Sequence, residues 1–149
     1  MRITNKLLYA IEAVLDIAYN SADETVQARD IAKRQGIPKR YLEQVLQQLV
    51  KEDILSGVRG PQGGYRLARE RRRINLAEIY DIIRKLEMSE NPALHESSEL
   101  GQKILRPLWH SIYDDMYHRL QQTTIDDLCK QAQQQGLMPK KRTKPDFVI

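Results

Sequence analysis

The amino-acid sequence predicts a mainly α-helical fold with one two-stranded β-hairpin and a long C-terminal helix. Three observations support this fold class. Apolar residues recur at helical spacing along most of the 149-residue chain. The stretch ILSGVRGPQGGYRLAR instead has strand character on both sides of a glycine-rich turn. Residues 99–122 keep one apolar face over their whole length.

The first three helices are expected within residues 4–52. The first covers residues 4–21, with apolar positions at Leu7, Leu8, Ile11, Val14, Leu15 and Ala18. After a polar break, the second helix, 28–35, ends at Gly36, the residue type that helix C-termini prefer. Pro38 opens the third helix, at a position where a missing N–H costs little. The apolar stripe of this third helix consists of Leu42, Val45, Leu46 and Leu49.

The second and third helices, joined by a tight turn with glycine, match the helix-turn-helix pattern. The polar face of the third helix presents Lys39, Arg40, Glu43, Gln44 and Gln47. Such side chains are what a recognition helix carries into a major groove of DNA. The hairpin, with strands over 54–59 and 65–68, then forms a wing, whose glycines let the backbone approach a phosphate. Arg59 is expected at the tip, where it can enter a minor groove.

Three further segments follow the wing. Asn75 is expected to cap a fourth helix over residues 76–86. A polar loop leads to the long helix, which Pro107 should kink or divide because proline cannot donate a backbone hydrogen bond. A last helix over residues 125–135 ends at Gly136. The basic tail after it is expected to be disordered.

Charge is unevenly distributed along the chain. Residues 29–73 carry twelve Lys/Arg against five Asp/Glu, a net +7, whereas residues 86–138 carry four against eight, a net −4. The helix-turn-helix and wing therefore hold the positive charge that a phosphate-binding surface needs. No apolar run is long enough to span a membrane and no signal peptide is recognised, so we expect a cytoplasmic protein.

Catalytic chemistry is not expected. No Ser/His/Asp set or carboxylate pair has a recognised spacing, and GPQGG is too short for a nucleotide-binding loop. The chain has one cysteine, Cys129, which excludes an internal disulfide and any metal site built from several cysteines of one chain. The sequence thus favours a binding protein over an enzyme.

The segment YLEQVLQQLVKEDILSGVRGPQGGYRLAR resembles the core signature of a family of winged-helix transcription regulators, which includes IscR, NsrR and CymR. The resemblance extends upstream through KLLYAIEAVLDIA and downstream through INLAEIYDIIRKLE, LRPLW and TTIDDL. It covers nearly the whole chain except the polar loop and the tail. On this basis the chain is identified as a member of that family, the Rrf-two superfamily.

The resemblance implies a homodimer on double-stranded DNA with a pseudo-palindromic operator, held together by long crossing C-terminal helices. It implies four segments: a DNA-binding domain (1–86), a loop at the family's cluster or effector position (87–98), dimerisation helices (99–136) and a disordered basic tail (137–149). The resemblance implies that Tyr41, Glu43 and Gln44 contact bases or the DNA backbone, and that Arg59 and Gly60 of the wing also contact DNA. Lys39 and Arg40 are expected to contact DNA because they point outward on the same helix. The expected dimer contacts are Leu105, Leu108, Trp109, Ile112 and Met116.

Each of these residues has an alternative interpretation. Glu43 would accept a hydrogen bond from a cytosine amino group, or pair with Lys39 one helical turn away. Tyr41 would contact DNA or pack against the turn. Arg59 would contact DNA or remain a solvated hairpin arginine. The run Arg71-Arg72-Arg73 would be a solvated strand end or support a phosphate.

The signal to which the protein responds is less defined. Relatives with an iron–sulfur cluster carry three cysteines before LRPLW, whereas this chain has MSENPALHESSELGQ there, so no cluster of that kind is expected. Three alternatives remain: Cys129 as a redox thiol rather than an inert core residue, a metal on His110, Asp114 and His118 rather than a solvated polar face, and a protein partner or small-molecule effector docking at the acidic loop and its neighbouring helix. A separate rival is a cluster held by non-cysteine side chains or across two subunits. For the function itself, we expect a repressor that competes with RNA polymerase for the promoter. The alternative class of function is a protein-interaction adaptor that has kept the fold and lost specific DNA binding.

Overall fold

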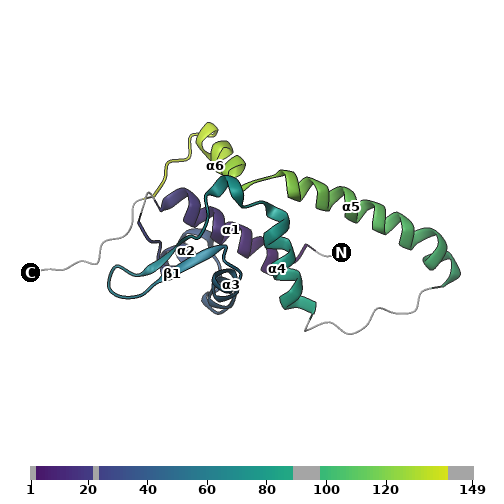
Figure 1. Ribbon diagram of the computed structural model, residues 1–149, viewed down its shortest axis with the longest axis horizontal. Helices are drawn as coiled ribbons and strands as arrows, with labels where there is room; N and C mark the ends of the chain where they lie inside the picture. The colour runs from purple at the N-terminus through teal and green to yellow at the C-terminus, as the bar shows by residue number, and fades with distance from the viewer. Residues whose placement is uncertain (1–2, 22–23, 89–97, 141–149) are drawn as a thin grey trace, which may run out of the picture.

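The computed structural model describes residues 3–21, 24–88 and 98–140 (Figure 1). In chain order the elements are α1 (Asn5–Asn20), α2 (Ala28–Gln35), α3 (Lys39–Lys51), β1 (Leu55–Val58), β2 (Gly64–Leu67), η1 (Arg71–Arg73), α4 (Leu76–Met88), η2 (Gly101–Leu105), α5 (Arg106–Gln122) and α6 (Ile125–Gln134). The predicted fold class, mainly helical with a winged helix-turn-helix and a long C-terminal helix, is confirmed.

Helix α1 forms the centre of the hydrophobic core and packs against α2, α3, α4 and α6. Thr4 caps its start, because its Oγ1 accepts a hydrogen bond from the N–H of Leu7 at 3.3 Å. The buried α1 residues meet the whole predicted apolar stripe of α3, whose four members are each 0% exposed. The sequence predicts that α6 belongs with the dimerisation helices, but Ile125 and Cys129 of α6 lie in this same core.

The turn between α2 and α3 has the geometry that the sequence predicts. Gly36 lies in the left-handed region with φ 64°, and the N–H of Ile37 donates to the carbonyl oxygen of Ala32 at 3.2 Å. Pro38 precedes the first residue of α3. At the other end of α3, Asp53 adopts a positive φ of 60°, which closes the helix and directs the chain into β1.

The wing is a two-stranded antiparallel sheet in which Leu55 pairs with Leu67 and Val58 with Gly64. A third segment supports it, because Val26 forms an isolated antiparallel bridge with Tyr65 through two backbone hydrogen bonds of 2.8 Å. This support was not anticipated from the sequence. It connects the wing to the loop before α2.

Helix α4 begins with the predicted Asn75 cap. The N–H of Glu78 donates to Asn75 Oδ1 at 3.0 Å, and the N–H of Asn75 donates to a Glu78 carboxylate oxygen at 3.1 Å. The next described residues, from Ser98, lead into the π-helical turn η2, and α5 starts at Arg106. Pro107 lies in the first turn of α5, next to the boundary with η2, and the backbone stays helical across that boundary. The expected boundary inside the long helix is therefore present as a change from π-helical to α-helical turns.

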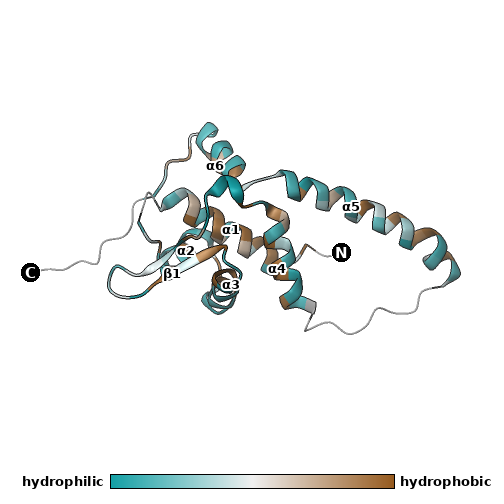
Figure 2. Ribbon diagram, viewed as in Figure 1, coloured by the Kyte–Doolittle hydropathy of each residue, from teal (hydrophilic) through white to brown (hydrophobic). Residues whose placement is uncertain are grey.

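Helix α5 extends away from the rest of the molecule, with its N-terminal end farthest out (Figure 1). Apolar positions recur along it as far as that end (Figure 2). Among the described residues, no helix is both long and apolar enough to cross a membrane.

The first four residues of the segment that the sequence predicts to be disordered, 137–140, contact helix α1. Tyr19 donates its hydroxyl to the carbonyl oxygen of Leu137, and the N–H of Lys140 donates to Asn20 Oδ1 at 2.7 Å. Residues 137–140 therefore lie against the end of α1. The remainder of the tail, 141–149, and residues 89–97 of the predicted loop lie outside the described residues.

Candidate nucleic-acid interface

The outer face of α3 consists of polar and charged side chains. The exposed residues on this face are Lys39, Arg40, Tyr41, Glu43, Gln44 and Gln47. They alternate with the four fully buried apolar residues, so burial of the stripe fixes which side chains point outward. The face can therefore donate hydrogen bonds from its cations and amides and accept them at its carboxylate and amide oxygens.

Glu43 and Lys39 form the ion pair expected from their spacing, with 4.0 Å between Lys39 Nζ and Glu43 Oε1. Their side chains are 55% and 77% exposed. At this distance and exposure the pair is weak, because water screens it. The Glu43 carboxylate consequently stays available to a base, and its role in base recognition remains a prediction.

Tyr41 is partly packed against the protein and partly exposed, so it has features of both a packing residue and a DNA contact. Its ring lies 6.4 Å from the ring of Tyr9 on α1, at an interplanar angle of 38°, yet the residue is 45% exposed. One side of the ring thus packs against the body of the protein. The remainder faces solvent beside the other outward residues of α3.

The wing tip presents Arg59 and Gly60 to solvent. Gly60 has φ 103°, a left-handed conformation that favours glycine. Gly63 is constrained by space instead, since a Cβ atom there would lie 2.5 Å from the carbonyl oxygen of Val58. Thr25 holds the tip from outside the hairpin by donating its hydroxyl to the carbonyl oxygen of Gln62 at 2.7 Å.

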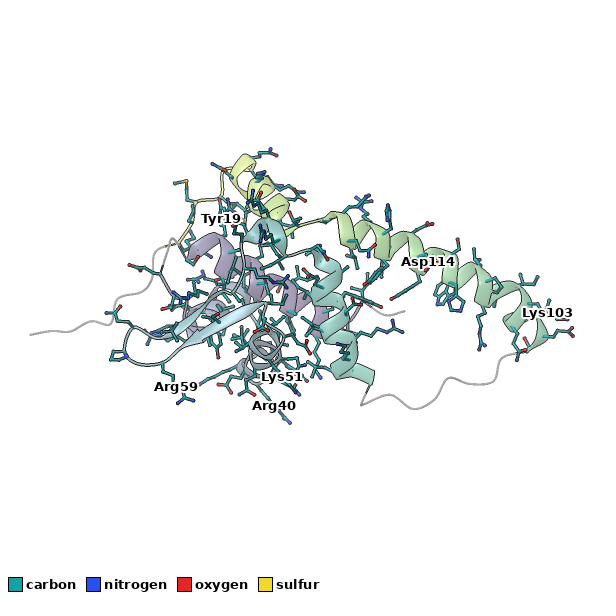
Figure 3. All side chains as sticks on the ribbon, in the orientation of Figure 1. Tyr19, Arg40, Lys51, Arg59, Lys103 and Asp114 are labelled. Carbon is teal, nitrogen blue, oxygen red and sulfur yellow. The ribbon has the colours of Figure 1, made fainter. Side chains whose placement is uncertain are left out.

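Helix α3 and the wing direct their basic side chains to the same side of the molecule. Figure 3 shows Arg40 and Lys51 of α3 and Arg59 of the wing along one edge of the view. The two halves of the predicted DNA-binding surface are thereby brought together. A duplex lying along that edge would meet a helix face and a basic hairpin at once.

A buried ion pair that sequence reasoning missed holds α2 against α1. Asp16 is 2% exposed, and Arg34 donates to both of its carboxylate oxygens at 2.9 and 2.7 Å. Gln35 adds a third hydrogen bond to Asp16 at 2.8 Å. The hydrogen bond to Asp16 raises the pKa of Arg34. The signal in the sequence was a single acidic residue within the apolar run AVLDIA.

The arginine run after the wing forms the short helix η1. Arg71 Nε lies 2.7 Å from a carboxylate oxygen of Asp126, and Arg72 Nε lies 2.6 Å from one of Glu70. These two arginines are thus engaged within the chain. A direct phosphate contact by them would compete with the ion pairs.

Cys129 is buried, 1% exposed, in the hydrophobic core. Burial raises the pKa of its thiol, and the nearby Arg71 opposes this only partly. The next residue along α6, Lys130, could supply an activating positive charge, but its Nζ lies 3.0 Å from Asp126 Oδ2. These features favour the interpretation as a core residue over that as a redox thiol.

The chain's donor residues do not fit the family's cysteine-ligated cluster. Three thiolates are needed, and the sequence contains one cysteine, which is enclosed in the core. Within residues 3–21, 24–88 and 98–140, no three His, Cys, Asp or Glu side chains gather in a way that could hold a metal ion. His110, Asp114 and His118 accordingly do not form such a group.

Comparison with known proteins is consistent with this geometry. HTH-type transcriptional regulator IscR of Xenorhabdus nematophila is 39% identical over 120 residues, which are 80% of this chain and 71% of that protein. The structure of T. potens IscR superposes with a TM-score of 0.74 at 28% identity, covering 94% of this chain and 93% of that one. CymR, the global cysteine regulator of B. subtilis, shares the fold alone, with a TM-score of 0.71 at 24% identity over 88% of this chain and 98% of its own.

The family comparison extends over most of the chain. Residues 3–131 match the family model described as Rrf2, iron-dependent transcriptional regulator. This match includes the helix-turn-helix, the wing, α5 and the first part of α6. It agrees with the expectation of a regulator rather than an enzyme. The chain belongs to the Rrf2 family of DNA-binding transcriptional regulators.

Proposed function

We propose that this protein is a homodimeric repressor that binds a pseudo-palindromic operator without an iron–sulfur cluster. The observation that carries the proposal is the common direction of the basic residues of α3 and of the wing, Arg40 and Arg59 (Figure 3). In the proposed complex α3 lies in a major groove, where Glu43 and Gln44 read base edges. Arg59 and Gly60 follow the neighbouring minor groove or its phosphates.

Dimerisation is proposed from the apolar face of residues 100–112, which the described part of the chain leaves exposed. Its large exposed side chains are Leu100, Ile104, Leu105, Leu108, Trp109 and Ile112. Trp109 is 57% exposed, and a contiguous apolar face of this kind on a water-exposed helix typically marks an interaction site. A second copy of the chain supplies an identical face, and two copies match the symmetry of a palindromic site. Met116, by contrast, packs partly against the chain's own core.

Repression follows from occupancy of a promoter in the cytoplasm, where the dimer excludes RNA polymerase. The regulating signal is proposed to be a protein partner or small-molecule effector rather than a redox change at the buried Cys129. An adaptor that has lost DNA binding is the alternative, and the next experiment distinguishes the two.

The test is selection of bound genomic fragments by the purified protein, followed by binding titrations at several salt concentrations. We expect a shared pseudo-palindromic motif and a linear fall of log affinity with log salt. Arg59→Ala should reduce the salt slope by about one phosphate contact if its role is electrostatic. Arg119→Ala is the matched control, because it removes an equal charge from an exposed position on α5. A monomeric protein that ignores duplex DNA at low salt would contradict the proposal.

A further inference from the structure

Helix α5 is attached to the rest of the described chain over a short part of its length. Its residues that pack against the core are Tyr113, Met116, Tyr117 and Leu120. Residues 106–112 are all exposed, and this half of the helix projects outward (Figure 1). The direction of the projecting half therefore depends on the contacts that the C-terminal half of α5 makes, chiefly with α4.

Those contacts centre on a cluster of five residues, which we call the α4–α5 clamp: Tyr80, Asp81, Arg84, Tyr113 and Tyr117. The Tyr117 hydroxyl donates to Asp81 Oδ2 at 2.6 Å, and its ring stacks on that of Tyr113 with centroids 5.9 Å apart. The buried Tyr80 meets the Tyr117 ring edge-on, with 6.2 Å between the centroids. Arg84 lies over the Tyr113 ring and donates to its hydroxyl at 3.1 Å.

The hydrogen bond between Tyr117 and Asp81 is well suited to hold a fixed angle. It is short and its acceptor is a carboxylate, which makes it stronger than a bond between neutral groups. The same bond, assisted by burial, raises the pKa of Tyr117 to about 12. Tyr117 therefore remains a protonated donor throughout the physiological range.

A second attachment at the C-terminal end of α5 acts as a pivot. The N–H of Leu76 donates to the carbonyl oxygen of Thr123 at 3.0 Å, and the N–H of Ile125 donates to that of Ile74 at 2.9 Å. With a rise of about 1.5 Å per residue, Tyr117 lies about 9 Å from Thr123 along the axis. By the same measure Leu105 lies about 27 Å away. A displacement of about 1 Å at the clamp thus becomes about 3 Å at Leu105.

We propose that the α4–α5 clamp sets the separation of the two recognition helices in the dimer and so selects the half-site spacing of the operator. This inference rests on the dimer of the proposed function. A movement of about 3 Å is close to one base-pair step, because ten to eleven base pairs span about 34–36 Å. Tyr117 and Asp81 are positioning residues here, acting through the direction of α5 rather than through DNA contact.

The experiment uses the selected operator and two derivatives in which the half-sites are one base pair closer or farther apart. For each full-length variant the affinity ratio between the correct and altered spacings is measured, along with affinity for a single half-site. In Tyr117→Phe, which lacks the donor, and Asp81→Ala, which lacks the acceptor, we expect the spacing ratio to fall about three- to tenfold, the range that loss of one hydrogen bond produces. Half-site affinity should not change. The double variant should resemble either single one, because both remove the same bond.

One control variant and one further clamp variant separate this role from general stability. Ile79→Val shortens a fully buried side chain of α4 outside the clamp, and we expect it to lower stability without changing the spacing ratio. Arg84→Lys tests the exposed side of the clamp, where loss of the guanidinium over the Tyr113 ring should lower the ratio without unfolding the protein. Unchanged ratios in clamp variants that still dimerise and bind DNA would overturn this inference alone. A wild-type protein without dimers or DNA binding would overturn the proposed function and this inference with it.

Discussion

At the scale of single residues, Asp16 and Arg34 join the helix-turn-helix to the central helix through a buried ion pair. Two carboxylate oxygens of Asp16 accept three hydrogen bonds from Arg34 and Gln35. Desolvation of both charges offsets much of their attraction, so such a pair specifies an arrangement more than it adds stability. The arrangement specified here is the position of α2, against which α3 packs.

We predict that Arg34→Met lowers the stability of the fold by more than the contribution of the hydrogen bonds that Arg34 makes. The variant leaves Asp16 buried without a cationic partner. We expect a loss of about 2–3 kcal/mol in the free energy of unfolding, below the about 3–5 kcal/mol of fully buried pairs because the Arg34 side chain is 19% exposed. Urea unfolding measures it. Asp16→Asn combined with Arg34→Met should recover part of the loss, and a double variant as unstable as the sum of its singles would argue against this account.

Glu43 carries the next prediction, because a carboxylate on a surface that faces phosphates needs a specific partner. We expect Glu43→Ala to change base preference at one position per half-site by about 1–3 kcal/mol, while affinity for unrelated DNA stays equal or rises. A binding array of single-base operator variants measures both quantities. Lys39→Ala is the control, because it breaks the 4.0 Å ion pair and leaves the carboxylate in place. Uniform loss of affinity across all sequences would favour a merely structural role for Glu43.

At the scale of the elements, the wing depends on close backbone packing that only glycine permits. A Cβ at Gly63 would lie 2.5 Å from one carbonyl oxygen and 2.6 Å from another, of Val58 and Gly60. Backbone atoms cannot move aside as a flexible side chain can. The hairpin tip, with Arg59, would have to change shape to admit any side chain.

We therefore predict that Gly63→Ala distorts the tip and lowers operator affinity, with a cost in stability of about 1–3 kcal/mol. Gly57→Ala in β1 is the matched control, since a Cβ there meets no atom within 4 Å and the effect should stay within about 0.5 kcal/mol. Operator titrations and thermal unfolding of both variants provide the comparison. Equal affinities for the two variants would show that the tip takes no part in binding.

The start of α1, the end of α2 and the start of α4 could be predicted from the sequence because they depend on local interactions. Each of these helix ends is fixed by a hydrogen bond to a residue no more than four positions away, at Thr4, Gly36 and Asn75. The recognition face could be predicted for the same reason, since one buried stripe determines its orientation. Contacts between distant segments could not be predicted in this way. Asp16 and Arg34 are 18 residues apart, Asp81 and Tyr117 are 36 apart, and no periodic pattern encodes either pair.

At the scale of the whole molecule, the apolar stripe of α5 lies in two different environments, the protein core at one end and solvent at the other. Its C-terminal positions, Met116 and Leu120, pack against the chain's own core, whereas Trp109 and Ile112 remain exposed. The sequence marks both parts as apolar, and only the direction of α5 separates them. That direction follows from the contacts with α4. The sequence alone therefore could not decide whether Met116 lies in the core or on the exposed dimer surface.

The exposed part of the stripe leads to the last prediction, which concerns assembly. Trp109→Glu places a charge at the centre of the proposed dimer surface, where it would be desolvated without a partner, so we expect a folded monomer. Sedimentation velocity measures the assembly and circular dichroism the fold. His110→Glu introduces the same side chain at the adjacent exposed position of α5, outside the apolar stripe, and should remain dimeric.

DNA binding of the Trp109→Glu variant gives an independent check. A monomer keeps its affinity for one half-site but loses the effective concentration of the second, so operator affinity should fall by about 10²-fold or more. If Trp109→Glu stayed dimeric with full operator affinity, the two chains would have to meet through a different face.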